Sequence, residues 1–219
     1  MKKSLDRIPV TIQHFYPGEL DINKNAKLCG DYVGMVISAN HEFVPALSHR
    51  SGTQQENFGS GSPWLGKEQK TPLAGFPMPY VEKMMGEQHN IFAQDPHGRT
   101  IGFMSFIHDL AKVNPSILQH VNIVAHKGQD AIINYLSTLV VDSRLRGHGV
   151  ATQLYEYLEN NLPKDAVANI QSTRTWSTNN SHLPLLAKRG YKLTDTIKND
   201  RYDVKTNSQV DTVYFAKAL

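Results

Sequence analysis

The sequence contains a single cysteine, Cys29, among its 219 residues. One thiol cannot form an intramolecular disulfide, so the fold has to be held by its core, and a reducing, cytoplasmic setting is expected. No histidine lies near Cys29 in the sequence. We therefore expect a small buried thiol at this position and not a cysteine nucleophile.

Long apolar runs are missing as well. No stretch approaches the ~20 apolar residues that a membrane-spanning helix needs. The basic start Met1–Arg7 is not followed by the apolar segment of a secretion signal. We therefore expect neither membrane anchoring nor export. With 40% hydrophobic residues, a chain of 219 residues can bury a full core and is most simply one domain.

Dense charge of one sign is also absent, because the net charge is only +3 and the basic residues are dispersed. A nucleic-acid-binding protein more often carries a basic stripe with interleaved aromatic residues. We therefore expect no nucleic acid among the partners. The 10 histidines include no pair at i, i+4 spacing with a third ligand, so we expect no metal centre.

The most informative segment of the chain is Ile132–Asn160. Its apolar and β-branched residues from Tyr135 to Val141 predict a buried strand. A polar turn with two glycines follows, and then apolar residues recur with helical spacing, which predicts a helix with one buried face: Val150, Leu154, Leu158 and Leu162.

The two glycines, Gly147 and Gly149, indicate what this turn can bind. Residues without Cβ let main-chain N–H groups converge on an anion, and the start of the following helix adds its unpaired N–H groups and positive dipole end. Arg144 and Arg146 add positive charge at the same place. The segment therefore predicts a phosphate-binding turn.

Two common nucleotide-binding motifs fit the chain less well. A dinucleotide-binding fingerprint needs a third glycine, but the segment Gly147–Thr152 ends in threonine and no βαβ repeat follows. The segment Gly61–Lys67 nearly spells a Walker loop, but Glu68 stands where Ser or Thr must reach magnesium, and no strand precedes it.

The spacing Arg146-x-x-Gly149-x-Ala151 directly after an apolar strand resembles the Gln/Arg-x-x-Gly-x-Gly/Ala pattern of the GCN5-related N-acetyltransferase (GNAT) superfamily. In that family the main-chain amides of this turn bind the pyrophosphate of acetyl-coenzyme A. A second motif lies downstream, where many members have a strand, an asparagine, and a short helix that ends in glycine. Asn179 and Gly190 keep the family's separation.

The resemblance implies the fold and the donor. We expect an α/β protein with a mixed, mostly antiparallel central sheet flanked by helices, the acyl-CoA N-acyltransferase fold. Residues 1–219 would form one domain, with 1–75 an elaborated N-terminal part on the acceptor side and 76–219 the core that binds acetyl-CoA. The residues that the resemblance assigns to the coenzyme are Leu139, Val140, Val141, Arg144, Arg146, Gly147, His148, Gly149, Val150, Ala151, Thr152 and Asn179.

The resemblance also implies direct acetyl transfer to a primary amine of a small molecule or a peptide. The family's usual general acid is a tyrosine four residues before the second-motif glycine, but this chain has Leu186 there. Tyr191, Tyr214 or water would have to protonate the leaving thiolate. Alternatively, the protein binds the coenzyme without catalysing transfer.

No general base is evident on the central strand, since Tyr135–Val141 holds only small polar side chains. A base is still required, because an alkyl amine is mainly a cation at neutral pH. The candidates by position are His108 and Asp109 after a predicted strand, His41 and Glu42 in the N-terminal part, and His182 beside Asn179.

The remaining segments complete the expected layer structure. We predict a strand over Ile8–Tyr16, a helix over Pro79–Met85, a hairpin, a connection over 111–130 and a final pair of strands. The segment Asn23–Val44 stays ambiguous, because Gly30 and Gly34 interrupt a helical pattern. The hairpin strands are His89–Gln94 and Thr100–Ile107, and the final strands are Tyr191–Ile197 and Thr212–Ala216 across a polar loop.

Two expectations concern regions where no motif helps. The segment Ser48–Gly75 is rich in Gly, Ser, Pro and Gln, so it is either a surface insertion or a lid over the acceptor pocket with Trp64 as an apolar wall. The C-terminal strand would allow a homodimer if it paired at a sheet edge.

Overall fold

The computed structural model describes residues 6–21, 23–39, 42–43, 86–110, 115–121, 132–161, 169–203 and 205–219. The predictions for 48–75, for a helix at 79–85 and for His41 and Leu162 lie outside these residues.

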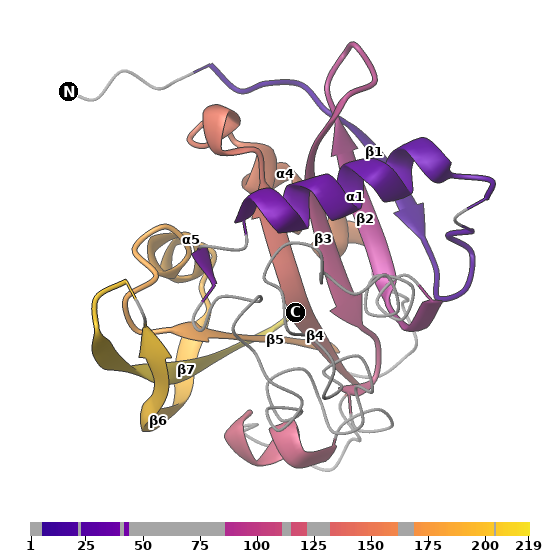
Figure 1. Ribbon diagram of the computed structural model, residues 1–219. Helices are drawn as coiled ribbons and strands as arrows, with labels where there is room; N and C mark the ends of the chain where they lie inside the picture. The colour runs from indigo at the N-terminus through magenta and orange to yellow at the C-terminus, as the bar shows by residue number, and fades with distance from the viewer. Residues whose placement is uncertain are drawn as a thin grey trace.

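The described residues contain a sheet of seven strands in the order β1-β2-β3-β4-β5-β7-β6 (Figure 1). All neighbouring strands are antiparallel except β4 and β5, which are parallel. This arrangement confirms the predicted mixed, mostly antiparallel sheet. The strands are β1 Thr11–Phe15, β2 His89–Gln94, β3 Thr100–Ile107, β4 Ile132–Val141, β5 Asn169–Trp176, β6 Lys192–Asp203 and β7 Ser208–Ala218.

Helices cover both faces of the sheet. Helix α1 (Ala26–Ala39) lies on one face, and α4 (Val150–Asn161) lies on the other, where Figure 1 shows it behind the strands. The apolar face of α4 matches the prediction, with Val150, Leu154 and Leu158 buried in the core. A short helix, α5 (Leu183–Lys188), follows β5, and a 3-10 helix, η5 (Pro115–His120), interrupts the predicted connection. Among the described residues, no helix has the length and apolar character to cross a bilayer.

The segment that the sequence left ambiguous forms α1. Gly30 and Gly34 lie on its exposed side, while Tyr32 and Val36 are buried against Phe103 and its neighbours in the sheet. The burial of the apolar face therefore outweighs the low helix propensity of the two glycines, which is about 1 kcal/mol each.

The last two strands are longer than predicted. The polar residues 198–203 belong to β6, so only 204–207 separate it from β7. Thr212 of β7 links these residues across the two strands, because its Oγ1 accepts from Arg201 Nε at 3.0 Å and donates to Asp200 Oδ2 at 2.5 Å. An edge strand tolerates such residues. The edge strand is β6, and the C-terminal strand β7 lies inside the sheet between β5 and β6, so β7 does not itself offer an edge for a second copy.

Candidate functional site

The central feature of the site is a split in the sheet between β4 and β5. The two strands pair only from Ile132 opposite Asn169 to Leu136 opposite Thr173. Beyond these residues, β4 continues to Val141 and β5 to Trp176, but the two strands no longer pair with each other. A cleft of about 1080 Å³ opens at the split, and residues of both strands line it.

The edge of β4 directs main-chain groups toward this cleft. The register of β4 against β3 is regular from Thr138 to Val141. The Asp142 N–H donates to the Ile101 carbonyl oxygen at 2.9 Å, on the side of β3. Successive residues of a strand direct their N–H and C=O groups to opposite sides, so those of Leu139 and Val141 face the split. An extended ligand can pair there like an added strand.

The glycine turn lies at one end of the same cleft. Gly147 and Gly149 have φ angles of 84° and 79°, both in the left-handed region that glycine adopts without strain. Left-handed residues that alternate with ordinary ones turn successive N–H groups into one concavity. Helix α4 begins at Val150, directly after the turn. The local geometry is therefore that of an anion-binding site.

The two arginines of the turn have different positions. Arg146 lines the cleft, with its guanidinium held by Glu42 at 2.8 Å and by the Val141 carbonyl oxygen at 3.3 Å. Arg144 pairs with Asp142 at 2.7 Å, and its side chain is 74% exposed. Arg144 does not line the cleft. Of the two arginines of the turn, only Arg146 is therefore placed to contact a ligand inside the cleft.

The structure brings the other predicted coenzyme residues together. All of them except Arg144 line the cleft: Leu139, Val140, Val141, Arg146, Gly147, His148, Gly149, Val150, Ala151, Thr152 and Asn179. They come from three segments, namely the free edge of β4, the turn with the start of α4, and the loop after β5. The two sequence motifs thus lie on one surface.

The loop after β5 is fixed by its own hydrogen bonds. The Asn179 side-chain Oδ1 accepts from the His182 N–H at 3.1 Å, and its Nδ2 donates to Thr175 Oγ1 at 2.8 Å. His182 Nε2 lies 2.9 Å from the Tyr155 hydroxyl oxygen. Burial lowers the pKa of His182 to about 4, so this imidazole is neutral at pH 7.

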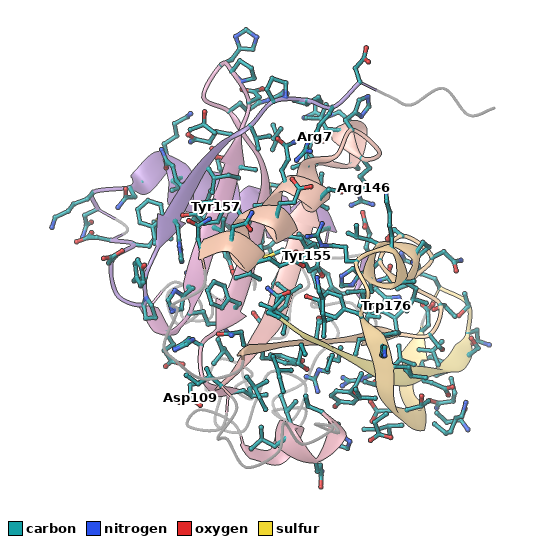
Figure 2. All side chains as sticks on the ribbon, turned by 180° about the vertical axis from the view of Figure 1, so that it is seen from behind. Arg7, Asp109, Arg146, Tyr155, Tyr157 and Trp176 are labelled. Atoms are coloured by element: carbon teal, nitrogen blue, oxygen red, sulfur yellow. The ribbon has the colours of Figure 1, made fainter. Side chains whose placement is uncertain are left out.

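The predicted catalytic candidates lie elsewhere. His108 and Asp109 follow the end of β3 that pairs with Tyr135, far along β4 from the glycine turn, and Figure 2 shows Asp109 at the opposite end of the sheet from Arg146. Tyr191 is buried, and its hydroxyl donates to Gln171. None of the three lines the cleft.

The two tyrosines considered as general acids are buried, whereas two of the candidate bases line the cleft. Burial raises the pKa of Tyr191, which disfavours its ionised form. Tyr214, the second hydroxyl that we considered, is only 2% exposed and stacks on His120. Glu42 and His182 do line the cleft.

Leu186, at the position of the family's tyrosine, is fully buried in the core beside α4. We expect Leu186→Tyr to lower the free energy of unfolding by about 1–3 kcal/mol, because a larger polar side chain has to fit a filled core. Urea unfolding measures this change. The volume-conserving Leu186→Met should cost less than about 1.5 kcal/mol, and equal losses for both variants would contradict this account of the position.

Several cleft residues carry no sequence signal of their own. Phe43 follows α1, Trp176 ends β5, and their ring centroids lie 6.2 Å apart on the cleft wall. Asp203, at the end of β6, and Arg7, before β1, also line the cleft. Only the fold brings these residues together. No group of three or more His, Cys, Asp or Glu side chains among the described residues is arranged to hold a metal ion.

The sequence profile of the acetyltransferase (GNAT) family matches residues 68–191, more than half of the chain. The chain belongs to the GNAT family. No curated protein sequence matches it.

Solved GNAT structures share the fold at low sequence identity. A putative acetyltransferase from Acinetobacter baylyi has a TM-score of 0.57 and 12% identity, over 96% of this chain and 94% of that one. NAA60 from Arabidopsis thaliana, in complex with a bisubstrate analogue, has a TM-score of 0.55 and 14% identity, over 95% and 98%. A GNAT-family acetyltransferase from Streptococcus pneumoniae has a TM-score of 0.55 and 15% identity, over 96% and 100%. These similarities establish the acyl-CoA N-acyltransferase fold of this GNAT protein.

Proposed function

We propose that this GNAT protein transfers an acetyl group from acetyl-CoA directly to a primary amine of a small molecule or a peptide. The observation that carries the proposal is the continuity of the cleft, because the split between β4 and β5 opens onto the glycine turn. One extended ligand with an anionic end fits both parts. Cys29 is a free, buried thiol, which agrees with a cytoplasmic setting.

The proposed donor site divides into three parts. The main-chain amides from Gly147 to Thr152 hold the pyrophosphate at the start of α4, with Arg146 beside it. Leu139 and Val141 hydrogen-bond the extended pantetheine arm from the free edge of β4. Asn179, on the loop after β5, closes the opposite side of the cleft.

The proposed chemistry is amine attack on the thioester carbonyl. The nitrogen lone pair forms the new C–N bond through a tetrahedral intermediate, the nitrogen gives up a proton to water or to a basic side chain of the cleft, and the C–S bond then breaks to release coenzyme A thiolate. The main-chain N–H of Leu139, which faces the split, stabilises the negative charge that develops on the carbonyl oxygen. Because Leu186 is apolar and buried, the proton for the thiolate has to come from water or from a polar side chain of the cleft.

The acceptor side of the cleft combines an apolar wall with polar groups. Phe43 and Trp176 form the wall, and Asp203, Lys205 and Thr206 come from the β6–β7 hairpin. We expect Trp176→Ala to raise the KM for the acceptor about tenfold, because it removes aromatic contact area worth about 1–2 kcal/mol. The Kd for acetyl-CoA should stay within about twofold. Equal losses for donor and acceptor would contradict this division of the cleft.

The decisive experiment follows thiol release from acetyl-CoA with and without a panel of amines that includes polyamines, amino acids and peptides with a free N-terminus. Amine-dependent thiol release with acetylated product supports the proposal. Binding of acetyl-CoA without turnover by any amine would favour the alternative, a coenzyme-binding or regulatory protein, to which the buried Leu186 gives specific support. Absence of acetyl-CoA binding would contradict both.

A further inference from the structure

The segment before β1 lies across the glycine turn. The sequence predicts a strand from Ile8, but β1 begins at Thr11, and before it Arg7 and Ile8 contact the glycine turn and the start of α4. The Ile8 N–H donates to the His148 carbonyl oxygen at 3.1 Å, and the Gln153 side chain donates to the Ile8 carbonyl oxygen at 2.7 Å. Two main-chain anchors therefore fix this segment, which we call the N-terminal strap (residues 6–10).

The strap places Arg7 directly over the turn. A Cβ atom on Gly149 would lie 3.1 Å from Arg7 Cγ and 3.8 Å from Arg7 Nε. The Arg7 side chain lines the cleft together with Arg146, and Figure 2 shows both residues at the start of α4. A guanidinium thus lies within reach of the concavity that the glycine N–H groups form.

Each of these two arginines is held by a carboxylate from another part of the chain. Arg146 pairs with Glu42, and Arg7 pairs with Glu156 on the outer side of α4. The Arg7 and Glu156 side chains are 52% and 42% exposed, so water screens their attraction and the pair is easily exchanged. A phosphate offers more negative charge and a geometry that a guanidinium binds with two hydrogen bonds.

We propose that Arg7 is a phosphate ligand of the coenzyme and exchanges Glu156 for a phosphate group when the coenzyme binds. The inference rests on the proposed donor site and adds a side-chain contact to the main-chain amides of the turn. The strap keeps the Arg7 main chain in place during the exchange, so only the side chain has to move. The pyrophosphate and the 3′-phosphate of coenzyme A share the required chemistry.

Calorimetric titration of the full chain with acetyl-CoA tests the proposal. Arg7→Gln is expected to raise the Kd about tenfold, and Arg7→Lys to raise it less, because the charge stays and the second hydrogen bond is lost. Lys198→Gln is the control, because it removes the same charge from an exposed residue that pairs with Asp211. This variant should bind acetyl-CoA with the Kd of the parent protein.

Glu156→Gln separates a phosphate contact from a purely structural role of Arg7. If Arg7 binds phosphate, the loss of its carboxylate partner should leave acetyl-CoA binding unchanged or tighten it about two- to fivefold. If the pair only anchors the strap, Glu156→Gln should weaken binding as Arg7→Gln does, which would overturn the proposal. Wild-type affinity in Arg7→Gln would overturn it as well.

The phosphate is identified by repeating the titration with 3′-dephospho-acetyl-CoA. If Arg7→Gln also binds this analogue about tenfold more weakly than the parent protein does, Arg7 contacts the pyrophosphate. If the two proteins bind the analogue equally well, Arg7 contacts the 3′-phosphate. Absence of acetyl-CoA binding by the parent protein would refute the proposed function itself, and this result is distinct from parent binding that Arg7→Gln leaves unchanged.

Discussion

Replacing Gly149 with glutamate is expected to abolish acetyl-CoA binding, with a Kd at least about 100-fold above that of the parent protein. Three effects act together. The residue has a φ of 79°, which side chains other than glycine rarely adopt. Its Cβ would lie 3.1 Å from Arg7 Cγ, and the carboxylate would repel phosphate from the turn. Calorimetric titration measures the loss.

Gly98→Glu is the matched control for this substitution. Gly98 has a φ of 71° in the turn between β2 and β3, and nothing lies within 4 Å of the position of its Cβ. Both variants carry the same new charge and a similar backbone strain of about 1–2 kcal/mol. Only Gly149→Glu should lose binding. If Gly149→Glu bound acetyl-CoA with nearly parental affinity, the turn would be a structural feature and not the phosphate site.

Acidification from pH 7.5 to pH 5 is expected to lower the free energy of unfolding by about 4 kcal/mol or more, because His89 and His182 contribute about 2 kcal/mol each and His14, whose pKa burial also lowers, adds to the loss. Burial lowers the pKa values of His89 and His182 from 6.5 to about 4. For His89, the nearby His14 and His108 contribute to this shift besides burial. Between pH 6.5 and pH 4 the unfolded chain therefore binds more protons than the folded protein, so stability falls as the pH falls through this window and is constant above it.

Urea unfolding at the two pH values measures this dependence. His89→Gln should reduce the loss between pH 7.5 and pH 5 by about 2 kcal/mol, since one of the two histidines with the largest pKa shifts is removed. His97→Gln, in the exposed turn between β2 and β3, serves as the control and should leave the loss unchanged. A stability that is the same at both pH values would show that neither histidine is kept neutral by the fold.

The parts of the site that local sequence predicts are those built within one segment. The glycine turn, the strand before it and the apolar face of α4 depend on residues a few positions apart, so spacing and residue type were sufficient to predict them. The contacts between Arg7 and Glu156, or between Arg146 and Glu42, join residues from distant parts of the chain. No pattern within either segment indicates them.

Tertiary burial accounts for the remaining differences. The sequence left α1 ambiguous because Gly30 and Gly34 interrupt its pattern, and only the sheet beneath Tyr32 decides for a helix. The polar residues of β6 suggested a loop, but Arg201–Asp203 pair with β7, and Asp211 of β7 holds the irregular stretch between them and Ile197 by accepting from Lys198 Nζ and the Asn199 N–H. In both places a neighbouring element outweighs the local preference of the chain.

The split between β4 and β5 also has a mechanical consequence. Four strands lie on one side of it and three on the other, and the hydrogen-bonded seam that joins them ends at Leu136 and Thr173. The C-terminal ends of β4 and β5, beyond these two residues, can therefore move apart at little energetic cost. A bound molecule that contacts both strands would hold them together. At a concentration of 100 times its Kd it would add about 2.7 kcal/mol to the free energy of unfolding. The stability of this fold would then vary with the concentration of the proposed acyl donor.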